Sequence, residues 1–128
     1  MKKTNLLIGV CLSLAILSLA VAAASDLTAQ EMAKLAKESV TRYPDYEMTA
    51  VQAFWGDATF IKQCAPKEGA LPDPFVIYVE ILADGAMGRS MFEPLSTTAA
   101  CIRDFTANRS FPKPPEPYML EIQMSFEP

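Results

Sequence analysis

The sequence contains no histidine, and this absence excludes several classes of functional site. The chain therefore has no histidine to activate a serine or cysteine nucleophile, and it lacks a residue that commonly binds zinc and haem iron. The chain also has no glycine-rich phosphate loop, no Cys-x-x-Cys pair and no basic cluster. Nucleic acids and anionic lipids are recognised by clustered lysine and arginine, so neither is an expected partner.

Carboxylates are the remaining candidates for acid–base chemistry. The aspartates and glutamates between residues 73 and 104 fall in predicted turns or on predicted solvated faces, which does not favour a catalytic dyad. The sequence therefore predicts a protein that is not an enzyme and that has no cofactor and no small-molecule substrate.

Residues 1–24 contain no acidic residue and are predicted to be a secretory signal peptide. Two lysines precede a long apolar stretch, and three alanines ending at Ala24 precede Ser25, where cleavage is expected. The apolar stretch is close to the roughly 20 residues that cross a bilayer, so an uncleaved membrane anchor is the alternative. The short signal with two lysines is typical of bacteria, which predicts a periplasmic protein.

The predicted mature chain, residues 25–128, is short and acidic. Its 104 residues carry 9 basic and 15 acidic side chains, a formal charge of −6. This length supports one domain with a modest hydrophobic core.

The mature chain retains two cysteines, Cys64 and Cys101, because Cys11 falls inside the predicted signal. In an oxidising compartment, an even pair in a small domain is most simply one disulfide. The bond would close a loop of about 38 residues and contribute roughly 4 kcal/mol in the chain-entropy description. A reactive thiol pair and a soft-metal site are the alternatives.

The first predicted element is a helix from Leu27 to Arg42. Thr28 can cap it, and Glu31 has the spacing of a capping box. Residues 45–63 fit a second helix, although the run 58–61 is equally typical of the start of a strand.

A β-hairpin, a helix and a final strand are predicted next. Asp84 and Gly85 form the hairpin turn, and a proline-rich stretch must be an extended connector. Along the final strand, even-numbered residues are apolar and odd-numbered ones face water. The predicted elements are strands 75–82 and 86–92, a helix from Ser96 to about Asn108 with Ala99, Ile102 and Phe105 buried, connector 110–117 and strand 118–126. The fold class is α+β, with a helical region over 25–64 and a second unit over 65–128.

From Val76 to Phe126, this order of elements resembles the TonB-like C-terminal domain family. The resemblance is carried by the Asp84-Gly85 turn, an apolar helix and the aromatic-proline pair Phe111-Pro112. One cysteine before the first strand and another in the helix resemble the AgmX/PglI-type variant. The predicted cleavable signal and the short connector before the sheet depart from the retained transmembrane anchor and long proline-rich spacer of energy-transducing TonB proteins.

The resemblance implies a protein-interaction module that captures an extended peptide. In that family the last strand is an exposed edge, to which a partner adds a strand. Carried over to this chain, the candidate partner-binding residues are Met119, Glu121, Gln123 and Ser125. The expected partner is an envelope protein or peptide, and a homodimer through the same strand is the alternative partner.

Methionine and cysteine sulfur support a different function, a periplasmic accessory protein for copper or redox chemistry. Thioethers suit Cu(I), and the chain has seven methionines. Met87 and Met91 are predicted to share one strand face, with Met119 on a neighbouring strand. Filling of the core is the simpler explanation for these residues.

Overall fold

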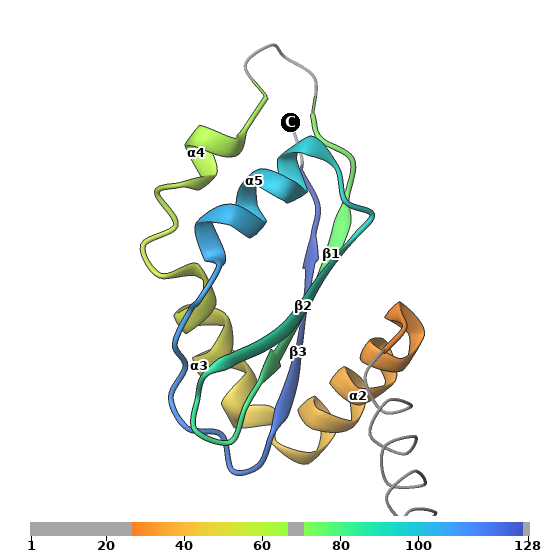
Figure 1. Cartoon of the computed structure of the whole chain (residues 1–128), viewed down its shortest axis with the longest axis vertical. Helices are drawn as coiled ribbons and strands as arrows, with labels where there is room; N and C mark the ends of the chain where they lie inside the picture. The colour runs from red at the N-terminus through yellow and green to blue at the C-terminus, as the bar shows by residue number, and fades with distance from the viewer. Residues whose placement is uncertain (1–26, 67–70, 127–128) are drawn as a thin grey trace, which may run out of the picture.

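The computed structural model describes residues 27–66 and 71–126. The predicted signal peptide, its cleavage point after Ala24 and Cys11 lie outside the described residues. Within the described ranges, four helices and a three-stranded antiparallel sheet confirm the α+β class (Figure 1). No described helix is both long and apolar enough to cross a membrane. The elements are α2 (Ala29–Arg42), α3 (Pro44–Trp55), α4 (Ile61–Cys64), β1 (Phe75–Ile81), β2 (Met87–Glu93), α5 (Thr97–Thr106) and β3 (Tyr118–Met124).

The helix boundaries follow from their capping residues. Thr28 and Glu31 form the predicted capping box at α2: the Thr28 hydroxyl accepts the Glu31 N–H at 3.2 Å, and the Glu31 carboxylate accepts the Thr28 N–H. Helix α2 ends at Arg42, and Pro44 opens α3 because proline is tolerated in the first turn. The ambiguous region is therefore helical up to Trp55, and residues 58–61 form no strand.

The strand order is β2-β1-β3, so β1 is central and β3 is an edge strand. The predicted turn joins β1 to β2: the Leu82 N–H donates to the Ala86 carbonyl, and the Asp84 carboxylate accepts the Ala86 N–H, both at 2.9 Å. Gly85 has φ of +90°, a conformation that favours glycine.

Helices cover both faces of the sheet (Figure 1). The main core lies between one face and α3, α4 and α5, and it includes the even-numbered apolar residues of β3. A smaller cluster on the opposite face joins α2 to the sheet through Met32, Ala36, Tyr78 and Met119. Met119 was predicted to face water and is only 4% exposed, because α2 packs over it.

Helix α5 begins at its predicted cap, where the Ser96 hydroxyl accepts the Ala99 N–H at 3.1 Å. Ala99 and Ile102 are fully buried as predicted. The prediction for Phe105 was wrong: it is 42% exposed and stacks against Phe60 at the edge of the core.

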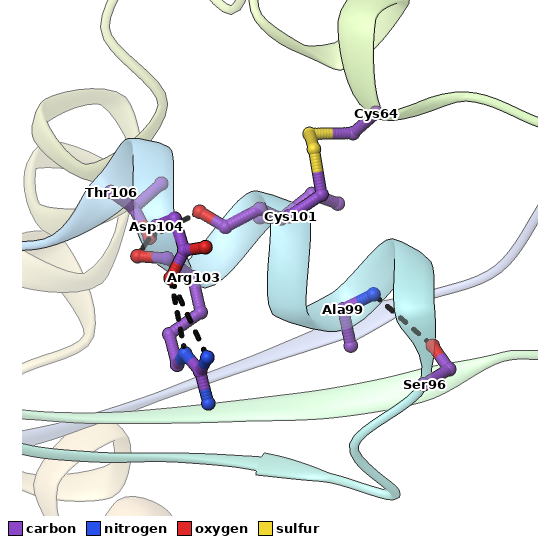
Figure 2. Close-up of a disulfide and its surroundings, with 8 residues drawn as sticks. Cys64, Ser96, Ala99, Cys101, Arg103, Asp104 and Thr106 are labelled. Carbon is purple, nitrogen blue, oxygen red and sulfur yellow. Dashed lines mark hydrogen bonds and ion pairs between the residues drawn. A yellow bond between two sulfur atoms is a disulfide. The ribbon is translucent and has the colours of Figure 1, made fainter.

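The predicted disulfide between Cys64 and Cys101 is present. Figure 2 shows it joining the last residue of α4 to the middle of α5, with Cα atoms 5.5 Å apart. It therefore fixes the α4 segment over the same side of the sheet as α5.

A bulge in β2 changes which side chains share a face. Residues 88 and 89 lie opposite Glu80, because the pairing shifts between Val79–Ser90 and Ile81–Met87. Met87 packs against the main core, whereas Met91 packs against the α2 cluster. The prediction that these two methionines share one face was therefore wrong.

Tyr118 carries a buried hydroxyl with no hydrogen-bond partner among the described residues. Its ring is 2% exposed and meets the Tyr46 ring edge-on at 5.0 Å between centroids. Burial, with a smaller contribution from the Glu47 carboxylate, raises the pKa of the Tyr118 phenol to about 12. The folded protein therefore favours the neutral phenol, but it leaves the hydroxyl unpaired.

Replacement of Tyr118 with phenylalanine is expected to raise the free energy of unfolding by about 1 kcal/mol, because it removes this unpaired polar group. Chemical denaturation at pH 7 measures the change. The wild type should also lose stability between pH 10 and about 12, where the unfolded phenol ionises before the folded one, and the variant should lose less.

The matched control is Tyr46→Phe. The Tyr46 hydroxyl donates a hydrogen bond to the Pro112 carbonyl at 2.5 Å. Loss of this bond is expected to lower the free energy of unfolding by about 1 kcal/mol. A loss of similar size in Tyr118→Phe would contradict the assignment of an unpaired hydroxyl.

Candidate functional site

The outer edge of β3 is open along only part of its length. The Met119 N–H donates to the Ser39 hydroxyl of α2 at 3.1 Å, so it points away from β1. In an antiparallel pair, successive residues direct both backbone polar groups alternately toward and away from the partner strand. The backbone groups of Glu121 and Gln123 therefore also point outward, and among the described residues Ser39 blocks this edge at Met119 alone.

The side chains of the candidate edge residues lie in different environments. Met119 is buried under α2, Glu121 is half-buried opposite Tyr78 of β1, and Gln123 is exposed. Ser125 is exposed and lies beyond Met124, where the strand ends. The structure thus brings Glu121 and Gln123 together on the open part of the edge.

A groove of about 420 Å³ runs beside this open part. Helix α2 forms one wall with small and aliphatic residues, and α3 contributes a single carboxylate. Neither the α2 wall nor Ser39 was identified from the sequence, since both depend on where α2 packs on the sheet. The groove is lined by Ala33, Ala36, Lys37, Val40, Glu47, Glu121 and Gln123.

The opposite edge of the sheet is less regular. The β2 bulge brings the Arg89 guanidinium 2.9 Å from the Glu80 carboxylate, which also accepts the Arg89 backbone N–H at 3.2 Å. The side-chain hydrogen bond from Arg89 lowers the pKa of Glu80 below its ordinary value. Bulges and charges of this kind protect edge strands from pairing. Of the two edges, β3 is the better template for an added strand.

No family model, curated protein or solved structure matches the chain. Among the described residues, no group of three or more cysteines, aspartates and glutamates is arranged to hold a metal ion. Cys64 and Cys101 are joined to each other, so neither presents a free thiol for metal or redox chemistry.

A second, more apolar pocket of about 230 Å³ lies beside the disulfide. Ile102 of α5 and Phe126, which follows β3, contribute to its lining together with Leu71. It presents few polar groups that could orient a ligand, whereas the β3 groove exposes directional backbone donors and acceptors.

Proposed function

We propose that the mature protein is a periplasmic interaction module, similar to the TonB C-terminal domain, that binds an extended segment of an envelope protein along β3. The main support is that the backbone groups of Glu121 and Gln123 face outward beside a groove. A segment in this groove would continue the sheet through backbone hydrogen bonds, which is β-augmentation.

Two further features support the proposal. The order β2-β1-β3 leaves the last strand at an edge, as the TonB resemblance requires. The disulfide suits an oxidising compartment such as the periplasm. The copper or redox alternative is weakened because the cysteines are bonded, while Met32 and Met119 are buried in the α2 cluster. Binding of a protein segment requires no catalytic group.

Glu121→Pro is expected to abolish partner binding while preserving the fold. Proline removes one backbone N–H, and at Glu121 that N–H points away from β1, so no bond within the sheet is lost. Ser90→Pro is the matched control: the β1–β2 register places the Ser90 N–H on the opposite outer edge.

The measurement is cross-linking of the mature protein in its own periplasm, with a photoreactive residue in place of Gln123. The wild type and Ser90→Pro should give the same cross-linked partner, and Glu121→Pro should give none. Thermal unfolding of all three must first show equal folding. Equal capture by Glu121→Pro, or no capture by any form, would contradict strand addition at β3.

A further inference from the structure

The β3 groove has a different chemical character on its two walls. The α2 wall presents the half-buried side chains of Ala33 and Val40, which are short enough to leave space for those of a partner. Glu121 lies on the α2 side of the sheet, because it is two residues from Met119 along β3. Glu47 reaches the groove from α3, which packs on the opposite face.

Two carboxylates and one ammonium group line the groove, and none of them forms an ion pair within the described residues. From the part of the chain that the structure describes, the Glu121 carboxylate accepts only a long hydrogen bond, 3.4 Å, from the Gln123 amide. Burial raises the pKa of the Tyr78 phenol on the neighbouring strand, and the negative charge of Glu121 raises it further. The groove therefore carries a net negative charge, and an added strand meets the Glu121 carboxylate on the open part of the edge.

We infer that the partner segment carries lysine or arginine opposite Glu121, flanked two residues away by small apolar side chains that pack on Ala33 and Val40. This inference rests on the proposed function and specifies its ligand. Side chains two apart on a strand share a face, so the cation and its apolar neighbours all point toward α2. Directly opposed unlike charges stabilise a strand pair, whereas like charges destabilise it.

The same chemistry disfavours a second copy of this chain as the occupant. The outward-facing stretch of β3 contains Glu121 and no basic residue, and the predicted mature chain is acidic overall. Pairing two β3 strands about a two-fold axis would bring the two Glu121 carboxylates toward each other. A basic segment from another protein avoids this repulsion.

The test is selection of binders from a displayed library of random nine-residue peptides on the purified mature protein. The selected peptides are expected to share a lysine or arginine with apolar residues two positions away. Replacing that basic residue with glutamate should weaken binding at least about threefold. In Glu121→Lys the preference should reverse, so that the glutamate peptide binds more tightly.

Glu38→Lys is the control, because Glu38 is exposed on α2, does not line this groove and gives the same change in net charge. It should retain the wild-type preference. Peptides whose binding is lost in Glu121→Pro but which show no basic preference would overturn the inference and leave the proposed function standing. Failure to select any peptide sensitive to Glu121→Pro would overturn both.

Discussion

Replacement of both Cys64 and Cys101 with alanine is expected to lower the free energy of unfolding by about 4 kcal/mol. The disulfide joins residues 37 positions apart in sequence, so its loss frees a long loop in the unfolded chain. A domain of this size has a total stability of roughly 5–15 kcal/mol, so the loss is a large share. Urea denaturation at pH 7 gives the change.

The two single variants provide an internal control. Because the bond needs both sulfurs, each single replacement should produce most of the loss, and their effects should not add. Wild-type protein treated with a reductant should fall to the same level as the double variant. A loss below about 1 kcal/mol in the double variant would show that the remaining contacts of α4 and α5 hold this region without the bond.

Replacement of Gly85 with alanine is expected to lower the free energy of unfolding by about 4 kcal/mol. A Cβ at this position would lie 2.2 Å from the Phe111 carbonyl oxygen, and the backbone has φ of +90°. The positive φ alone costs about 1–3 kcal/mol for a residue with a side chain, and the clash adds to it because the Phe111 N–H is bonded to the Gly85 carbonyl. Separation of the two segments would break that bond.

Gly56→Ala separates these two contributions. Gly56 also has positive φ, +57°, but nothing lies within 4 Å of an added Cβ. Its replacement should lower the free energy of unfolding by about 2 kcal/mol, through backbone strain alone. Equal losses at the two glycines, measured by urea denaturation, would show that the contact between the turn and Phe111 contributes nothing.

The parts of the fold that depend on short-range patterns were predictable from sequence. The capping box needs only Thr28 and Glu31 three residues apart, and the hairpin needs only Asp84-Gly85 between two apolar runs. The alternation along β3 correctly assigned the residues that face the main core. The disulfide was predicted from the even pair of cysteines in the predicted mature chain.

The parts that depend on long-range packing were not predictable. The bulge in β2 arises where Gly88 leaves room for the Glu80 side chain, whose Oε1 atom would lie 2.4 Å from an added Cβ. Alternation assumes an unbroken strand, so it placed Met87 and Met91 on one face. Similarly, no local pattern states that α2 packs on the second face, where it buries Met119 and brings Ser39 to the edge.

The unlike edges of the sheet also determine how the molecule can associate with itself. Continuous fibres require a head-to-tail contact, in which β3 of one copy would pair with β2 of the next. The bulge at residues 88 and 89 interrupts the regular hydrogen-bonding register that such a contact needs. Pairing of β3 with β3 instead occupies the same edge on both copies and stops there. Self-association through β3 can thus close into a dimer, but it cannot seed open-ended polymerisation.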